Sequence, residues 1–266
     1  MSHQVCVEYP QGFTYSALAG NLRIHNVMRC GVISVDRREP IHTAASLMVQ
    51  KEISCLPVKD EDSIAGMLSD KDLLKSYSDS EYLPGLVEDY MTDVVISFDM
   101  EDPIADIWQC FIENPFRHAP ILQQQRFAGM ITGSDLIRVF LKHARAVNPE
   151  HRQTKKNDCL LAEDVMKCSL FGLLPDATLA EAMDMMIKRH ATGIPVVSQS
   201  MQLLGIITEK DLLRHISQFD VMTTKTEDCM TRDVVTFGPK SSLSEICDYL
   251  IGHDFHQMPI VDKGTL

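Results

Sequence analysis

Long apolar runs and short catalytic motifs are both missing from this sequence. Across its 266 residues, no apolar stretch approaches the roughly 18–20 residues that a membrane span requires. No Gly-x-Ser-x-Gly, Walker loop, His-Glu-x-x-His or dinucleotide fingerprint occurs either. These absences argue against a membrane-spanning protein and against the enzymes that such motifs mark. We therefore expect a protein that is not an enzyme and has no catalytic residues.

Positive charge is also scarce, because 25 Lys and Arg residues stand against 37 Asp and Glu residues and leave a net charge of −12. Nucleic acid is therefore disfavoured as a partner, since surfaces that bind it are basic. The N-terminal residues lack the basic and apolar stretches of a signal peptide, so we expect a cytoplasmic protein. The eight cysteines include no Cys-x-x-Cys pair, which favours reduced thiols. His253 and His256 have ligand-like spacing but no acidic or cysteine companions, so we expect no metal site.

What the sequence does contain is one motif that recurs four times. In each copy, a methionine precedes the proline of a Pro-Val or Pro-Ile pair by 29 residues. The four pairs are Met28 and Pro57, Met91 and Pro120, Met166 and Pro195, and Met230 and Pro259. A motif repeated at constant internal spacing indicates four copies of one structural unit.

Three of the copies continue with a glycine and then a Ser/Thr-x-x-Asp motif. These are Gly66 with Ser69 and Asp72, Gly129 with Thr132 and Asp135, and Gly205 with Thr208 and Asp211. The chain stops at Leu266, seven residues after Pro259, where the other copies need 15 or 16 residues to reach their aspartate. We interpret the fourth copy as incomplete. Either the chain is a fragment of a longer protein, which we favour, or a neighbouring chain covers the open sheet edge.

The third copy indicates how one unit is built. Residues 171–174 form a predicted short strand, and a Thr-x-x-Glu capping box at Thr178 predicts the start of an amphipathic helix. Strands are predicted at 194–197 and 203–207, and Thr208 would cap a second helix. The fold class is therefore α/β (α+β type), with a small three-stranded sheet and two helices in each copy. Such a unit is too small to bury both faces of its sheet alone, so the copies should pair.

The intervals between copies divide the chain. The methionines are 63 residues apart in the first two copies and 64 in the last two, but 75 across the middle. The extra length is polar and contains a proline, which is typical of a linker between two pairs. The predicted segments are an N-terminal extension 1–26, repeats at 27–80 and 88–145, a linker 146–161, and repeats at 162–219 and 226–266. The two predicted pairs are 27–145 and 162–266.

The four copies resemble CBS domains, named for cystathionine beta-synthase, over residues 27–266. The resemblance rests on the Val-Met of the first and third copies, the Pro-Val strand, and the glycine followed by Ser/Thr-x-x-Asp. It implies tandem pairs with pseudo-twofold symmetry that bind adenosine-containing ligands, such as AMP, ADP, ATP or S-adenosylmethionine, between paired domains. It further implies a homodimer that passes the binding state to an effector protein or to a missing C-terminal domain, with no required cofactor.

The Ser/Thr-x-x-Asp motif has two interpretations. In the first, the hydroxyl caps a helix and the aspartate offsets the helix dipole. In the second, the hydroxyl and free amides converge on a phosphate site at the end of a strand, and the carboxylate accepts both hydroxyls of a ribose. The candidate ligand-binding residues are Ser69, Asp72, Thr132, Asp135, Thr208 and Asp211.

The resemblance also implies which residues of the paired copy face each motif. They lie two and three places before the proline and would reach phosphates held by the motif. The implied sets are Ser69 and Asp72 with Arg117 and His118, Thr132 and Asp135 with Ser54 and Cys55 (helped by Lys71), and Thr208 and Asp211 with His256 and Gln257. Arg117 could instead form a surface ion pair. The fourth site lacks an aspartate and is expected to be empty.

An apolar pocket for the base is implied 24 places before the prolines, at Ile33, Ile96 and Phe171. As sequence alone, such residues are more often ordinary core strand residues. The favoured function is a regulatory sensor of adenosine-containing ligands. The alternatives are a ligand-free dimerisation scaffold and the N-terminal regulatory part of a larger signalling enzyme that continues after Leu266. Loss of ligand binding in variants of Asp72 and Asp211 would favour the sensor.

Overall fold

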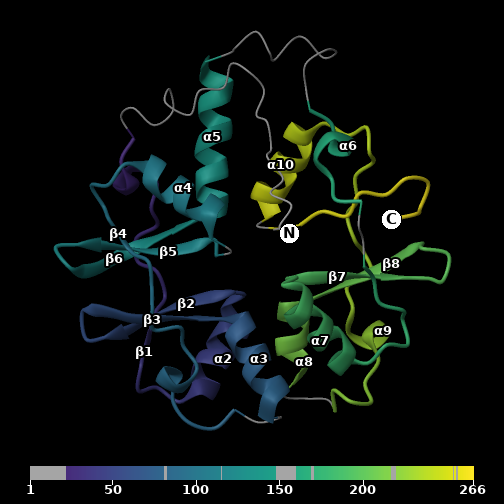
Figure 1. Ribbon diagram of the computed structural model, residues 1–266, viewed down its shortest axis with the longest axis horizontal. Helices are drawn as coiled ribbons and strands as arrows, with labels where there is room; N and C mark the ends of the chain where they lie inside the picture. Colours follow the sequence, from purple (N-terminus) through teal and green to yellow (C-terminus); the bar gives the residue numbers. More distant parts are fainter. Residues whose placement is uncertain are drawn as a thin grey trace, which may run out of the picture. The chain divides into compact units, whose positions relative to one another are not determined.

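Figure 1 shows the computed structural model of the chain, in which two compact units are present. The structure describes residues 22–80, 83–114, 116–147, 160–168, 171–216, 220–253, 255 and 257–266. One unit comprises Met1–Val32 and Ile96–Gln153, and the other comprises Ile33–Val95 and Thr154–Leu266. The first unit thus holds the second repeat, and the second unit holds the first, third and fourth repeats. These units differ from the predicted pairs, because the first and third repeats share a core.

The first two repeats contain the same five elements in the same order. In the first repeat these are β1 (Val35–Asp36), α2 (Ile41–Lys51), β2 (Cys55–Asp60), β3 (Ser63–Ser69) and α3 (Asp70–Ser80). In the second they are β4 (Phe98–Asp99), α4 (Ile104–Glu113), β5 (His118–Gln123), β6 (Arg126–Thr132) and α5 (Gly133–Val147). In both sheets the first strand is parallel and the third antiparallel to the middle strand. The predicted three-stranded sheet with two helices is confirmed.

The third and fourth repeats follow this plan with less strand pairing. The third contains α6 (Ala162–Val165), α7 (Leu179–Arg189), β7 (Gly193–Val197), β8 (Leu203–Thr208) and α8 (Glu209–Ile216). Its predicted strand at 171–174 is reduced to one parallel bridge, between Leu173 and Val196. The fourth contains α9 (Thr226–Cys229), α10 (Leu243–His253) and a parallel bridge between Phe237 and Ile260. None of the helices in the described ranges is long and apolar enough to cross a membrane.

The helix start predicted in the third repeat is confirmed by a capping box. The hydroxyl of Thr178 accepts the amide of Glu181 at 3.2 Å, and the Glu181 carboxylate accepts the amide of Thr178 at 2.8 Å. The helix ends at His190, whose left-handed backbone (φ 52°) stops it. In the first repeat, Glu52 ends α2 in the same conformation (φ 56°). The two helix ends are therefore equivalent although their residues differ.

A lead-in segment begins each repeat and packs on another repeat rather than on the rest of its own. The lead-ins are residues 22–32, 83–95, 160–168 and 224–236, which contain η1 (Ile24–Asn26), η2 (Val87–Asp89), α6 and α9. The antiparallel backbone pairs that they form with the last strands are Arg29 with Met130 of β6, Thr92 with Met67 of β3, and Thr231 with Ile206 of β8. The third lead-in pairs with the fourth repeat, at Leu161 and Ser242. The lead-in of one repeat thus pairs through its backbone with a neighbouring repeat in the sequence.

The motif glycines make this pairing possible. A Cβ atom on Gly66 would lie 2.7 Å from the carbonyl oxygen of Thr92, and one on Gly205 would lie 2.8 Å from that of Thr231. Gly129 has the same contact with the first lead-in. Real Cβ atoms essentially never come so close, so the lead-in strand can pass only over a glycine. The glycine in the repeated motif is therefore required by backbone approach.

The predicted boundary of the N-terminal extension, at residue 26, lies inside the fold. Ile24 in η1 is fully buried in the core of the first unit, where it joins Ile107, Ile121 and Ile131. The lead-in is therefore part of the packed structure, and the fold includes residue 22 onwards. Residues 1–21 and most of the predicted linker 146–161 lie outside the described residues.

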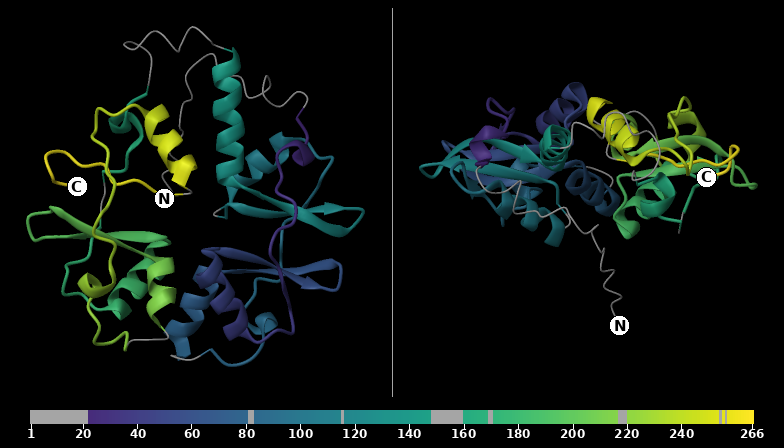
Figure 2. Two further views of the ribbon diagram at one scale, coloured as in Figure 1. Left: turned by 180° about the vertical axis from the view of Figure 1, so that it is seen from behind. Right: turned by 90° about the horizontal axis from the view of Figure 1, so that it is seen from above.

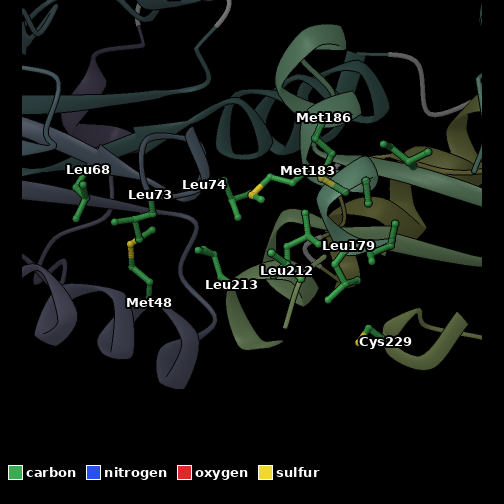
Figure 3. Packing of buried hydrophobic residues seen from close by; sticks show 14 of the residues in the cluster. Met48, Leu68, Leu73, Leu74, Leu179, Met183, Met186, Leu212, Leu213 and Cys229 are labelled. Atoms are coloured by element: carbon green, nitrogen blue, oxygen red, sulfur yellow. The ribbon is translucent and has the colours of Figure 1, made fainter. Parts of the chain in front are cut away.

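The core of the second unit joins the first and third repeats. Helix α3 packs against α7 and α8, and α2 packs against α8, as both faces of the unit show (Figures 1 and 2). Figure 3 shows Met48 and Leu74 of the first repeat in one cluster with Met183, Met186 and Leu213 of the third. These methionines fill the core between the helices, where their flexible side chains suit irregular gaps.

Candidate ligand site

Each Ser/Thr-x-x-Asp motif lies where a strand runs directly into a helix. In the third repeat, β8 ends at Thr208 and α8 begins at the next residue. The amide and the hydroxyl of Thr208 both donate to Oδ2 of Asp211, at 2.9 and 2.7 Å. The motifs at the ends of β3 and β6 form the same two bonds. The capping interpretation is therefore correct for all three motifs, and the cap uses one carboxylate oxygen in each.

The second carboxylate oxygen distinguishes the three sites. Oδ1 of Asp72 has no hydrogen-bond partner among the described residues. Oδ1 of Asp211 has only a loose ion pair with Nη1 of Arg214, at 3.6 Å. Oδ1 of Asp135 accepts hydrogen bonds from Nε of Arg29 and Nη1 of Arg138 and forms an ion pair with Nη2 of Arg29, all at 2.9 Å. The carboxylates of Asp72 and Asp211 therefore have an oxygen to offer a ligand, and that of Asp135 does not.

The third site contains a residue of the fourth repeat. A Cβ on Gly193 would overlap the side-chain amide of Gln257 and would lie 3.3 Å from Cγ2 of Thr208. Gln257 therefore lies over Gly193 next to Thr208, and the amide reaches this place because residue 193 has no side chain. Its predicted role toward a ligand stays a prediction. His256, its predicted companion, lies outside the described residues.

Arg117 has a local role that the sequence did not indicate. Its Nη1 donates to the backbone carbonyls of Phe111, Asn114 and Phe116, at 2.7–2.8 Å. The guanidinium thus satisfies carbonyl groups at the end of α4. The alternative of a surface ion pair is not what this side chain forms. His118 opens β5 and is half-buried. The predicted meeting of these two residues with Ser69 and Asp72 stays a prediction.

Lys71 contacts the third repeat, in the second unit. Its Nζ lies 3.2 Å from Nδ1 of His190, the residue that ends α7. The equivalent Lys210 donates to the carbonyl of Glu52, which ends α2, at 2.8 Å. These two contacts are related by the repeat itself, since each lysine follows the first residue of its helix. Lys71 therefore has a partner within the second unit, and its expected help to Thr132 and Asp135 stays a prediction.

Ser54 lies in the bend before β2, and Cys55 is the first residue of that strand. The carbonyl of Ser54 accepts the amide of Asp70 at 3.0 Å. Burial, and then the negative charges of Asp72 and Asp70, raise the pKa of the Cys55 thiol to about 12. This cysteine is therefore a neutral thiol at physiological pH, unsuited to holding a phosphate by charge.

The predicted base-pocket positions are exposed in two of three repeats. Ile33 is 38% exposed and Ile96 is 44% exposed, which contradicts the core-strand alternative for both. Val235 occupies the same place in the fourth repeat and is 42% exposed; the constant spacing to Pro259 could have revealed it. Exposed apolar side chains at one repeated position favour a contact with something outside the chain.

Phe171, the third predicted base contact, is half-buried and has a cation over its ring. The guanidinium carbon of Arg189 lies 5.6 Å from the ring centroid. An open pocket of about 600 Å³ lies beside it, lined in part by Gly172, Met185, Lys188 and Arg189. Phe171 thus contacts the last turn of α7, and its role as a base contact stays a prediction.

Two buried acids beside the motifs were missed from the sequence. Asp70 and Glu209 are the first residues of α3 and α8, and they are 3% and 8% exposed. Burial, followed by the charge of Glu209, raises the pKa of Asp70 to about 7. Burial and the charge of Asp72 raise the pKa of Glu209 to about 7, against the opposing effect of Lys71. Each directly follows a motif hydroxyl, the signal that could have identified it.

Metal-ligating side chains do not cluster in the described part of the chain, where no three His, Cys, Asp or Glu residues meet as a metal site. His253 instead stacks on Tyr249, with ring centroids 4.0 Å apart. Its Nδ1 lies 2.9 Å from the carbonyl oxygen of Tyr249.

Comparison with known families agrees with the repeat found in the sequence. The model of the CBS domain family matches residues 24–79, 87–142, 162–218 and 227–266. Protein MJ1225 of Methanocaldococcus jannaschii is 25% identical over 201 residues, which cover 74% of this chain and 71% of that protein. Inosine-5'-monophosphate dehydrogenase of Bifidobacterium longum is 32% identical over 121 residues, but these cover only 22% of the enzyme.

Two solved structures share the fold over nearly the whole chain. The crystal structure of MJ1225, which has been proposed as an archaeal homologue of γ-AMPK, superposes with a TM-score of 0.78 at 20% identity and covers 91% of this chain and 94% of that one. A conserved protein from Pyrococcus horikoshii superposes with a TM-score of 0.59 at 18% identity and covers 92% and 94%. At these identities the likeness establishes the fold.

Proposed function

Because this chain belongs to the CBS domain family, we propose that it is a regulatory module that binds an adenosine-containing ligand at the Thr208 and Asp211 motif. The observation that carries the proposal is the arrangement around Asp211. One carboxylate oxygen is fixed by the cap, the other has only a loose ion pair, and Gln257 of the fourth repeat lies over Gly193, next to Thr208. The AMP, ADP, ATP and S-adenosylmethionine class of ligand fits, since each contains a ribose diol.

The chemistry of this proposal follows from fixed geometry. Asp211 is 7% exposed, and its Oδ2 is held by the amide and hydroxyl of Thr208, so the direction of Oδ1 is set before a ligand arrives. A buried, oriented carboxylate accepts two vicinal hydroxyls with charge-assisted hydrogen bonds. The side-chain amide of Gln257 can donate to a ligand phosphate or a base nitrogen. Binding thus selects a diol next to a polar group.

Asp72 offers a second site of the same kind in the first repeat. Its cap is identical, and its Oδ1 has no partner among the described residues. The exposed Ile33 is the apolar residue that we propose to contact a base. We keep the phosphate role of Arg117 and His118 as part of this proposal. It requires Arg117 to leave the three carbonyls at the end of α4.

The module acts, in this proposal, without catalysis. Ligand binding would alter the packing of the repeats, and an effector protein or a further domain would receive that change. The resemblance of the whole chain to MJ1225, and the proposed relation of MJ1225 to γ-AMPK, support a regulatory role. A homodimer and a cytoplasmic location belong to the same proposal.

Calorimetry on the purified chain tests the ligand. We expect AMP, ADP, ATP or S-adenosylmethionine to bind the wild type, and Asp211→Asn to weaken that binding at least tenfold. Asparagine keeps an oxygen for the Thr208 amide, so the cap and the fold survive, but it loses the charge that holds the diol. Asp233→Asn changes an exposed aspartate of the fourth lead-in and serves as the matched control.

The competing function is a scaffold that works without ligand. One observation favours it, since the first and third repeats pack directly on each other through one buried apolar cluster. If none of the adenosine ligands binds at millimolar concentration, the scaffold replaces the sensor. Equal binding by the wild type and Asp211→Asn would instead place the ligand elsewhere.

A further inference from the structure

Asp135 is occupied by a side chain of the first lead-in. Nε and Nη2 of Arg29 both lie 2.9 Å from Oδ1 of Asp135, and Nη1 of Arg138 lies 2.9 Å from the same oxygen. Oδ2 is used by the amide and hydroxyl of Thr132, at 3.0 and 2.6 Å. The carboxylate is 4% exposed as a side chain. Both of its oxygens are therefore satisfied within the first unit.

The backbone fixes Arg29 in this place. Its amide donates to the carbonyl of Met130 at 2.7 Å, and the amide of Met130 donates to the carbonyl of Arg29 at 3.0 Å. Met130 lies in β6, five residues before Asp135. The lead-in thus runs beside the strand that ends at the motif, over Gly129, and its side chain reaches the carboxylate.

The same position is occupied by a different residue in the other pairings. Arg29 immediately follows the lead-in methionine, and its equivalents are Thr92, Lys167 and Thr231. Thr92 forms two bonds with Met67, at 2.8 and 2.9 Å, and Thr231 forms two with Ile206, both at 2.9 Å. Met67 and Ile206 lie five residues before Asp72 and Asp211, as Met130 does before Asp135. Thr92 and Thr231 therefore stand in the place of Arg29 at the two other motifs.

We propose that the residue after the lead-in methionine decides whether the carboxylate of the adjacent motif can take a ligand. Arg29 closes the Asp135 site by acting as its internal cation. Thr92 and Thr231 are too short and uncharged to do so, and they leave Asp72 and Asp211 open. The chain thus has two open sites, in its first and third repeats, and a closed one in its second. This inference rests on the proposed ligand function.

The energetic reason is competition for one buried anion. A guanidinium with two donors on a desolvated carboxylate forms a strong charge-assisted pair. A ribose diol is neutral, so exchanging Arg29 for it would take away one of the two guanidinium groups that lie 2.9 Å from the Asp135 carboxylate. A basic residue three places after the aspartate is common to all three motifs, so only Arg29 is peculiar in sequence to the Asp135 site. The equivalent of Arg138, Arg214, remains 3.6 Å from Asp211.

Exchanging the two side-chain types tests the proposal. In calorimetry with the adenosine ligand that binds the wild type, Arg29→Thr should add one binding site per chain. Adding Asp135→Asn to that variant should remove the new site. Conversely, Thr231→Arg should weaken binding at the Asp211 site at least tenfold.

Matched controls isolate charge from packing. Arg138→Thr leaves Arg29 in place, so it should add no site. Thr231→Val keeps a β-branched side chain on the lead-in without a charge, so the Kd at the Asp211 site should not change. An unchanged stoichiometry in Arg29→Thr, or an unchanged Kd in Thr231→Arg, would overturn the inference while the wild type still binds.

A ligand-free measurement separates this inference from the proposed function. Thermal unfolding of Asp135→Asn, Arg29→Thr and the double variant reports whether the two side chains act as a pair. We expect the double variant to lose clearly less melting temperature than the two single losses combined. If the wild type binds no adenosine ligand, the proposed function fails. If the losses of melting temperature in the single variants add up in the double variant, the pairing of Arg29 with Asp135 is contradicted as well.

Discussion

At the scale of single residues, the same motif performs different tasks because its neighbours differ. Asp72, Asp135 and Asp211 all cap a helix through Oδ2, which is a structural role. Only the partner of the other oxygen separates an open carboxylate from a closed one, and Arg29 supplies that partner at Asp135. Whether a motif aspartate has an open oxygen therefore depends on the lead-in residue that lies next to it.

The motif glycines give a residue-scale prediction about stability. Gly205→Ala should destabilise the protein by about 1–3 kcal/mol, because its Cβ would lie 2.6 Å from the sulfur of Met230 and 2.8 Å from the carbonyl of Thr231. Gly252→Ala is the control, since nothing lies within 4 Å of its Cβ. It lies inside α10, where alanine should stabilise by roughly 0.5–1 kcal/mol. Urea unfolding of both variants decides, and equal effects would contradict the prediction.

At the scale of elements, α3 and α8 bring two acids together at their first residues. The pKa of Asp70 is raised by the charge of Glu209 and lowered by that of Lys210. The pKa of Glu209 is lowered by the charge of Lys71 and raised by that of Asp72. The lysines of both helices reach across to the ends of α7 and α2. The contact between the first and third repeats thus combines an apolar core with a polar margin that responds to pH.

The pH dependence of this contact has a definite sign. The folded pKa values of Asp70 and Glu209 are about 7, above the ordinary values of 3.8 and 4.5 for these side chains, so the folded state binds protons more tightly than the unfolded state. The free energy of unfolding should therefore rise by about 1–2 kcal/mol as pH falls from 8 to 6. This added stability is lost as pH rises through 7.

Urea titrations at pH 6 and pH 8 measure this effect. Asp70→Asn and Glu209→Gln should each flatten the dependence, because an amide does not titrate. Asp233→Asn, an exposed site, should leave it unchanged. A wild type that is equally stable at both pH values would show that these acids are ionised in the folded protein without cost.

At the scale of the whole molecule, the chain is organised by exchange rather than by independent repeats. Lead-ins pack on other repeats, and the second unit takes in residues of three repeats. The first and third repeats contribute to a single buried cluster, in which Leu74 is 1% exposed (Figure 3). These two repeats should therefore gain and lose structure together.

Hydrogen exchange tests that coupling. Leu74→Ala removes a large buried side chain and should destabilise the second unit by about 2–5 kcal/mol. Because the core is shared, amides of β7 in the third repeat should lose protection along with those of β2 in the first. Leu204→Ala, at a position that is 38% exposed, is the control and should change protection little. Loss confined to the first repeat would show that the two repeats open separately.

The sequence by itself determined what is local. The 29-residue spacing identified four copies, the Thr178 box located a helix start, and the three Ser/Thr-x-x-Asp motifs located the strand-to-helix junctions. These features depend on neighbours a few residues away, so propensity and capping chemistry suffice to find them. The CBS family and the α/β class followed from the same repetition.

Tertiary structure alone decided how these local units are used. The first lead-in belongs to the core of the second repeat, so the expected extension 1–26 ended too late. The contacts of Arg29 with Asp135 and of Lys71 with His190 join residues 106 and 119 positions apart. The side chain of Arg117 binds carbonyl groups at the end of the preceding helix, α4. These contacts depend on which residues, distant in sequence, are brought together in a buried environment and on their charges. The local pattern of a single sequence does not specify this.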